Sequence, residues 1–262
     1  MKPVTLSRRL QGVVSMVTCG NRVCDVGCDH GFVSIYLIEQ RISPSVLAMD
    51  VRPGPLGAAR EHIAEHGLAD VIETRLSDGL HNYNTGEADT LICAGMGGSL
   101  MMRILCEDIE KTLSFRELVL QPQSEVEAFR RSLRGLGYCI VEENMIEEDG
   151  KFYPMMRGIA GGGVRMDVSS VRPADETVPS EVNEIELCKL NDRYGELLLQ
   201  RKDKTLAAYL RREEKIFEEI LDNLRRQGLA DEKRMCRYEQ VSELLEDCRK
   251  ALAMVGNRPC RG

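Results

Sequence analysis

The chain has 262 residues, and its 43% hydrophobic and 29% charged residues are typical of a globular protein with one large domain or a domain and an appendage. It has no apolar run of the roughly 18 residues that a membrane span needs, so we expect no membrane partner. The net charge is −7, and residues 180–262 hold 17 basic and 17 acidic side chains, so the negative excess lies in residues 1–179. Bulk charge therefore argues against a nucleic-acid-binding protein and leaves only local basic patches for that role.

The ten cysteines are scattered, with no C-x-x-C pair and no Cys/His cluster. This spacing favours reduced thiols over a disulfide framework or a zinc site, and we expect no metal. Arg8 and Arg9 lie where a signal peptide would have its apolar core. We therefore expect a cytoplasmic protein.

The first predicted element is a short amphipathic helix, because apolar residues recur at helical spacing from Leu6 to Val17, with Thr5 or Ser7 as N-cap. Strands and helices then alternate, which implies right-handed crossovers and a parallel sheet. The expected strands are Val23–Val26, Val46–Asp50, Val71–Leu76, Thr90–Ala94 and Glu117–Leu120. The expected helices are Gly31–Gln40, Pro55–His66, a helix from Gly98 to about Ile109, and Glu125–Leu136.

Two more strands, Tyr138–Met145 and Phe152–Ile159, flank the acidic turn Glu147–Gly150 and are typical of an antiparallel hairpin. The polar stretch Gly161–Pro179 is punctuated by Gly and Pro, which indicates a linker or loop.

The last part of the chain is predicted to be helical. Ser180 is a candidate cap for a helix that Gly195 ends, and two heptad seams follow. The first seam is Leu206, Leu210, Glu213, Phe217, Ile220 and Leu224, and the second is Tyr238, Val241, Leu245, Cys248, Leu252 and Val255. We expect an antiparallel helical hairpin, since each arm has too narrow an apolar face to be stable alone. A coiled-coil dimer seam is the alternative.

Acidic residues end two of the predicted strands and suggest a ligand site. The stretch RVCDVGCDHG runs from an apolar strand into Asp25 and then the glycines Gly27 and Gly31, which let a backbone approach a ligand closely. Asp50 ends the next strand 25 residues later, where Rossmann-like folds place the carboxylate that binds ribose hydroxyls. An ordinary strand-to-helix turn explains a lone glycine turn equally well, but two acidic ends indicate an adenosine-containing cofactor.

Four consecutive strand ends should then meet at one edge of the sheet. We assign Asp25 and the turn after it to the charged amino-acid end of the cofactor, and Asp50 to its ribose. Asp78-Gly79 is assigned to the adenine amine. The stretch Gly95–Gly98 has no large side chain except Met96, which leaves space for a planar substrate beside the reactive centre.

The motifs RLQGVVSMV, DVGCDHG, MDVRPGPLGAA, SDGL, ICAGMGG, LVLQPQ and KFYPM occur in this order. Over about Leu6–Ile159 the chain resembles the bacterial TrmK family, class I S-adenosylmethionine-dependent methyltransferases that modify N1 of adenine 22 in tRNA. It departs from the family in the longer insert Gly161–Pro179 and in having Cys28 and Cys93 beside the motif cores. Both cysteines are interpreted as small buried residues.

Together, the predicted elements and the resemblance indicate a Rossmann-like, seven-stranded α/β domain over residues 1–160, a linker over 161–179 and a helical coiled-coil hairpin over 180–262. The resemblance implies S-adenosylmethionine as cofactor and tRNA as partner. We expect a monomer, with a coiled-coil dimer as the alternative. The implied cofactor-binding residues are Asp25, Gly27, Cys28, His30, Gly31, Asp50, Val51, Asp78, Gly79, Gly95 and Met96. The candidate substrate-binding residues are Gly97, Gly98, Arg9, Arg52 and Arg103.

The expected mechanism is positional, because adenine N1 already carries a lone pair at neutral pH. Asp29 is a candidate for stabilising the cationic product, and Tyr153 for stacking on an extruded base. Tyr153 is equally well explained as a core residue, and His30 as a helix cap or a partner of a backbone carbonyl.

Three other functions compete with tRNA methylation. A methyltransferase of the same fold that acts on a small molecule suits the acidic first part of the chain. A nicotinamide-dependent dehydrogenase is disfavoured, because Gly27 and Gly31 lack the G-x-G-x-x-G spacing. A non-catalytic scaffold built on the helical hairpin is disfavoured by the four functional-looking strand ends.

Overall fold

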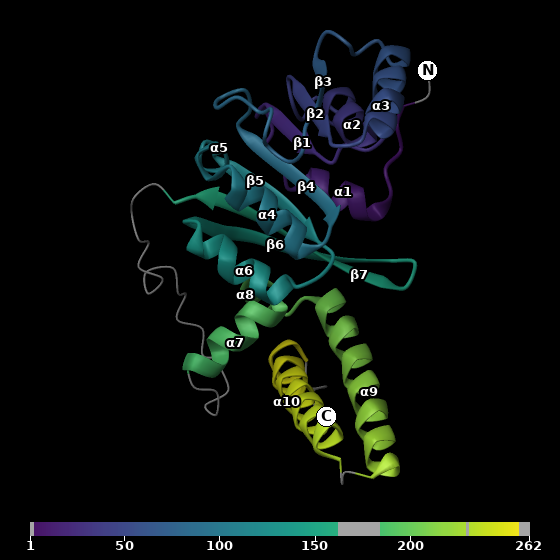
Figure 1. Ribbon diagram of the computed structural model, residues 1–262, viewed down its shortest axis with the longest axis vertical. Helices are drawn as coiled ribbons and strands as arrows, with labels where there is room; N and C mark the ends of the chain where they lie inside the picture. Colours follow the sequence, from purple (N-terminus) through teal and green to yellow (C-terminus); the bar gives the residue numbers. More distant parts are fainter. Residues whose placement is uncertain (1–2, 162–183, 229–230, 257–262) are drawn as a thin grey trace, which may run out of the picture. The chain divides into compact units, whose positions relative to one another are not determined.

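A computed structural model describes residues 3–161, 184–228 and 231–256 of the chain (Figure 1). The chain divides into two compact units, Met1–Asp167 and Val168–Gly262. The predicted linker 161–179 and its following cap, Ser180, lie outside the described residues apart from Gly161, and the expected domain boundaries stay predictions.

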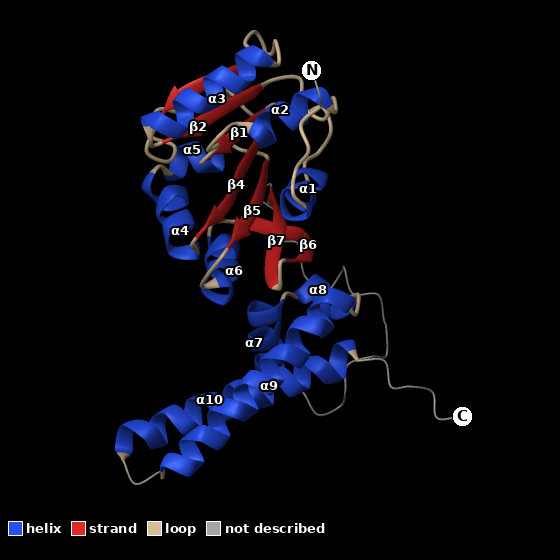
Figure 2. Ribbon diagram, turned by 90° about the vertical axis from the view of Figure 1, so that its right-hand side faces the viewer, coloured by secondary structure: helices blue, strands red, loops and turns tan. Residues whose placement is uncertain are grey.

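The first unit is built on one seven-stranded sheet (Figure 2), in the order β3-β2-β1-β4-β5-β7-β6. Strands β1 to β5 are parallel, β7 is antiparallel to β5, and β6 is antiparallel to β7. The strands are β1 Val23–Val26, β2 Val46–Asp50, β3 Ile72–Leu76, β4 Thr90–Met96, β5 Glu117–Pro122, β6 Tyr138–Glu148 and β7 Lys151–Ala160. The predicted seven-stranded α/β fold is confirmed.

Helices cover both faces of the sheet, which explains why β1, β2 and β5 are buried along their whole length. Helices α1, α2 and α3 contribute to one buried cluster, and α4 and α6 contribute to the other. The helices of this unit are α1 Arg8–Ser15, α2 Phe32–Glu39, α3 Pro53–Glu65, α4 Gly98–Glu107, α5 Ile109–Leu113 and α6 Val126–Gly135. Side chains alternate between the clusters along β1, so Val23 and Asp25 face the side of α1 to α3 while Cys24 and Val26 face the other.

Several predicted boundaries were wrong in informative ways. Helix α3 begins with Pro53 at its first turn rather than with Pro55, because either proline suits a helix start. The predicted helix to Ile109 breaks at Asp108, whose non-helical backbone (φ −116°, ψ 59°) separates α4 from α5. Strand β4 continues two residues beyond the predicted end, to Met96, with a register shift against β5. Ser7 is the N-cap of α1, and its hydroxyl accepts from the Leu10 amide.

The second unit contains α7 Glu184–Tyr194, α8 Glu196–Gln200, α9 Lys204–Gln227 and α10 Glu232–Val255. Helices α9 and α10 pack antiparallel, since Leu210 is bonded to Cys248 while Arg225 is bonded to Tyr238. The predicted hairpin is confirmed, although Leu221 rather than Leu224 is the buried residue of α9 against Val241 and Leu245.

Ion pairs join the elements of the second unit. Asp247 is buried on α10 and binds Arg193 of α7 at 2.5 Å. Lys189 of α7 lies 3.0 Å from the same carboxylate. Charged side chains therefore contribute to the packing of this unit as well as to its surface. No helix in the described parts of the chain is both long and apolar enough to span a membrane.

Candidate functional site

Asp25 lies at the carboxyl end of β1 and is 4% exposed. Ser34 of α2 donates its hydroxyl to Asp25 Oδ2 at 2.8 Å. Desolvation raises the pKa of Asp25 to about 6; the Ser34 bond opposes this shift, and the nearby Asp50 carboxylate adds to it. The site therefore holds a buried acid that is ionised at neutral pH with no cationic side chain bonded to it among its described contacts.

The turn after β1 brings the ends of three strands together. The Gly27 and Cys28 amides donate to the Met49 carbonyl of β2, at 2.8 and 3.0 Å. Gly27 has φ +78°, and a methyl group built on it would lie 2.2 Å from the Met96 Cε of β4. Glycine here therefore permits both the left-handed turn and the close approach of the Met96 side chain.

Asp50 ends β2 and is also 4% exposed. Its two oxygens accept backbone N–H groups, Oδ2 from Asp29 at 3.1 Å and Oδ1 from Arg52 at 2.9 Å. These bonds use two of the roughly four lone-pair directions of a carboxylate, which leaves acceptor capacity for a ligand hydroxyl. The same bonds hold Asp29 in its left-handed conformation, with φ 50°.

The exposed side of this turn carries the other predicted residues. Asp29 is 58% exposed and lies 3.5 Å from Arg52 and 3.8 Å from the His30 imidazole. His30 does not cap α2, whose N-cap is Gly31; its ring lies beside the rings of Phe32 and His62. The predicted capping role of His30 was therefore wrong.

The end of β3 connects to β2 and to α4. The Ser77 amide donates to the Asp50 carbonyl at 3.0 Å, so Asp78 and Gly79 follow Asp50 along the same edge. Asp78 is 57% exposed and binds Arg103 of α4 at 3.2 Å. If the Asp78 carboxylate accepts from the adenine amine, as predicted, it therefore also binds the Arg103 guanidinium. Val51, 55% exposed, completes the predicted residues of this edge.

The glycines after β4 have different surroundings. Gly95 is exposed, with φ +83°. Gly97 is the N-cap of α4, and a methyl group built on Gly98 would lie 2.4 Å from the Ser124 carbonyl oxygen. The Gly98 amide donates to that oxygen at 3.2 Å. Close packing against the loop before α6 therefore accounts for Gly98 without a substrate.

Arg9 reaches the ends of β4 and β5 from α1. Its Nη1 donates to Gln121 Oε1 at 2.8 Å, and its guanidinium lies 5.4 Å from the centroid of the Tyr153 ring on β7. A methyl group built on Gly95 would lie 3.5 Å from Arg9 Nη1. Tyr153 is half-buried against the core on the α1 side, so it meets both the core and the guanidinium.

The cysteines beside the motifs are buried in the structure. Cys93 is 1% exposed, and burial raises the pKa of its thiol to about 12. Burial and the neighbouring Asp25 carboxylate also raise the pKa of the Cys28 thiol. Both thiols are therefore protonated at neutral pH, as the interpretation of small buried residues requires. Among the described residues, no three His, Cys, Asp or Glu side chains gather as metal ligands.

The structure thus brings together the predicted residues at the ends of β1, β2 and β4, and it places Arg9 and Tyr153 at the ends of β4 and β5. Arg52 and Arg103, which are predicted to bind substrate, pair with carboxylates of the same edge. The residue that the sequence analysis missed is Gln121, which is fully buried at the end of β5. Its signal was a polar side chain inside the apolar run LVLQP.

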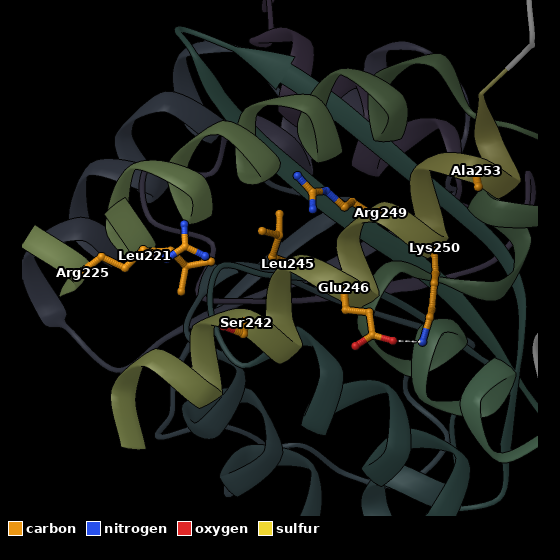
Figure 3. Close-up of a pocket in the computed structure, with 8 residues that line it drawn as sticks. All are labelled: Leu221, Arg225, Ser242, Leu245, Glu246, Arg249, Lys250 and Ala253. Atoms are coloured by element: carbon orange, nitrogen blue, oxygen red, sulfur yellow. Dashed lines mark hydrogen bonds and ion pairs between the residues drawn. The ribbon is translucent and has the colours of Figure 1, made fainter. Parts of the chain in front are cut away.

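A pocket of about 520 Å³ lies within the second unit, between α9 and α10 (Figure 3). It is lined by Leu221, Arg225, Ser242, Leu245, Glu246, Arg249, Lys250 and Ala253. Arg249 binds Glu214 and Glu218 across the hairpin, and Lys250 binds Glu246. Arg225 donates to the Tyr238 hydroxyl at 2.7 Å. The cations of this pocket therefore have partners within the hairpin, which argues against an anion-binding site.

Comparison with known proteins agrees with the geometry of the sheet edge. Residues 6–156 match the family model for a methyltransferase domain. A curated relative, the tRNA (adenine(22)-N(1))-methyltransferase of Bacillus subtilis, is 33% identical over 161 residues, which are 62% of this chain and 68% of that protein.

Two solved structures extend the likeness to both units. The Bacillus subtilis TrmK crystal structure is 25% identical, with a TM-score of 0.78 over 95% of this chain and 99% of that one. The Streptococcus pneumoniae Sp1610 complex with S-adenosyl-L-methionine is 26% identical, with a TM-score of 0.76 over 95% of this chain and 100% of that one. This chain therefore belongs to the TrmK family of class I methyltransferases.

Proposed function

We propose that this protein transfers a methyl group from S-adenosylmethionine to N1 of adenine 22 in tRNA. The observation that carries the proposal is the arrangement of Asp25, Asp50 and Met96 around the single turn at Gly27. The proposed substrate is the one for which the Bacillus subtilis relative is named. The geometry of the sheet edge supports the same reaction in this chain, since a related structure binds S-adenosyl-L-methionine.

The residues at this edge fit the proposed cofactor. The Gly27 turn carries no Cβ, which permits close approach to its backbone, and the amino-terminal amides of α2 follow it. Asp50 retains acceptor capacity for a ribose diol, and the Asp25 carboxylate suits a cationic amino-acid end. When bound, S-adenosylmethionine supplies an electrophilic methyl group on a sulfonium centre.

The residues of the chain then act by position. Adenine N1 needs no general base, so orienting its lone pair toward the methyl group is the main contribution. Methylation gives the base a positive charge. The Asp29 carboxylate, fixed through its amide to Asp50, is proposed to stabilise that charge, and Tyr153 is proposed to stack on the extruded base.

We propose that cationic side chains of each unit bind the substrate: the half-buried Arg9 in the first unit and exposed arginines in the second. Arg9 is the candidate at the sheet edge. On the hairpin, Arg211 and Arg226 are exposed and form no ion pair with other described residues. We propose a monomer, because the apolar faces of α9 and α10 are used against each other. Cytosolic tRNA as substrate implies a cytoplasmic protein.

The test is methylation of defined transcripts with methyl-labelled S-adenosylmethionine. A tRNA transcript with adenine at position 22 should take up label, and the same transcript with guanine there should not. Nuclease mapping should place the label on N1 of that adenine. Label at another nucleotide, or none in RNA, would contradict the proposal.

A small-molecule methyltransferase is the second candidate, favoured by one observation. Two of the three arginines predicted to bind RNA, Arg52 and Arg103, bind carboxylates of the same edge. Cofactor binding without label in RNA would support this alternative.

A further inference from the structure

The end of β5 carries a buried polar side chain that no step of the proposed reaction uses. Gln121 is fully buried, on the face of the sheet covered by α1. A buried amide is costly unless it is hydrogen-bonded. Its Nε2 donates to the Pro122 carbonyl at 3.3 Å, and its Oε1 accepts from Arg9 Nη1 at 2.8 Å.

These two bonds fix the direction of the Gln121 carbonyl and, through it, the guanidinium of Arg9. The start of α1 is held separately, since the Arg9 amide donates to Glu148 Oε1 at 3.4 Å. The guanidinium therefore rests between Gln121, the Tyr153 ring and exposed Gly95. A guanidinium has five N–H donors, and the described contacts of Arg9 use only Nη1, so its remaining donors suit a nucleotide acceptor.

We infer that Gln121 is a positioning residue for the RNA substrate, because its buried amide oxygen orients the Arg9 guanidinium beside Gly95 and Tyr153. The inference rests on the proposed function and adds the residue that orients its substrate-binding cation. Gln121 itself has no exposed surface and acts only through Arg9.

The test is a double-mutant cycle on tRNA methylation. Gln121→Met keeps the side-chain length and removes the acceptor, so kcat/KM for tRNA should fall about 10-fold or more, the value of one hydrogen bond to a charged group. The dissociation constant for S-adenosylmethionine should stay within about twofold, since no expected cofactor residue changes. Gln121→Glu keeps the acceptor and should recover most of the loss.

The decisive comparison is made in the Arg9→Met background. There Gln121→Met should cost nothing further, whereas a purely structural role would reduce activity again. Gln11→Met is the matched control, because Gln11 lies on the same helix and its amide binds only the Leu6 carbonyl in the described contacts.

Two results would overturn the inference alone: additive losses in the cycle, or an Arg9→Met variant that keeps kcat/KM for tRNA within about twofold of wild type. The second result stands even where Gln121→Met fails to fold. A wild-type chain that leaves adenine 22 unmethylated would overturn the proposed function and this inference together.

Discussion

The charged side chains of the two units differ in the kind of group that binds them. At the sheet edge, Asp25 and Asp50 are both 4% exposed and are bonded to a hydroxyl and to backbone amides. On the hairpin, Arg249 and Lys250 are bound by carboxylates of neighbouring helices. A hydroxyl or a backbone amide fixes a carboxylate without neutralising it, whereas an ion pair does both, and Asp50 also lies 3.6 Å from Arg52 Nε. The comparison shows why the Asp25 carboxylate remains available to a ligand, while Arg249 and Lys250 mainly support the fold.

The largest effect on cofactor affinity is expected from a substitution at the sheet edge. Asp50→Ala removes the acceptor for two backbone amides and for the proposed ribose, so S-adenosylmethionine should bind about 100-fold more weakly, from hydrogen bonds of about 1.5–3 kcal/mol each. Calorimetric titration measures this. Asp70→Ala is the control, since Asp70 is exposed in the loop before β3. Equal affinities of the two variants would remove Asp50 from the cofactor site.

The second prediction uses the pH dependence of Asp25. Its pKa is about 6 in the folded chain against an ordinary value of 3.8, because burial disfavours the charged form. The protonated carboxyl therefore favours folding below pH 3.8, and this contribution is lost as pH rises through about 6. The free energy of unfolding of Asp25→Asn, relative to wild type, should rise by about 2 kcal/mol from pH 4 to pH 7.

Urea denaturation at several pH values measures this difference. Ionisation of Asp25 should also strengthen binding of the cationic cofactor over the same interval in the wild type. A flat difference in unfolding free energy between pH 4 and pH 7 would show that the carboxyl titrates normally.

The third prediction concerns the exposed side of the turn. Asp29→Ala keeps the backbone amide that binds Asp50, so turnover on tRNA should fall about 10-fold while cofactor affinity changes less. Steady-state kinetics together with titration separate the two quantities. Unchanged turnover would remove Asp29 from the mechanism and leave it only its contacts with Arg52 and His30.

The smallest effects are expected on the hairpin, where they sharpen the comparison. Arg211→Ala and Arg226→Ala should each lower the slope of log affinity for tRNA against log salt by about one, because each phosphate contact releases a counterion. Arg249→Ala should leave that slope unchanged and lower the free energy of unfolding by less than about 1 kcal/mol, since its bonds are exposed ion pairs. If all three variants changed the salt dependence of tRNA affinity equally, ion-paired and unpaired arginines of the hairpin would contribute equally to tRNA binding.

Much of the fold was predictable, because its signals are local. Strand β2 was predicted to the residue, since a run of apolar residues buried on both faces has clear ends. The end of β4 was missed because Gly95 and Met96 carry no strand signal of their own, and pairing of Met96 with Pro122 extends the strand. Leu221 was missed because a strict heptad places Leu224 in the seam, whereas packing against Val241 selects the neighbouring turn.

The candidate site divides in the same way. The sequence by itself determined which strand ends carry carboxylates and glycines, because strand periodicity and turn chemistry are properties of neighbouring residues. Only the tertiary structure decided that Arg52 and Arg103 bind those carboxylates and that Arg9, from a helix 112 residues earlier in the chain, meets Gln121. Such contacts depend on which elements the folded sheet places side by side, and no local sequence pattern specifies which distant residues will meet.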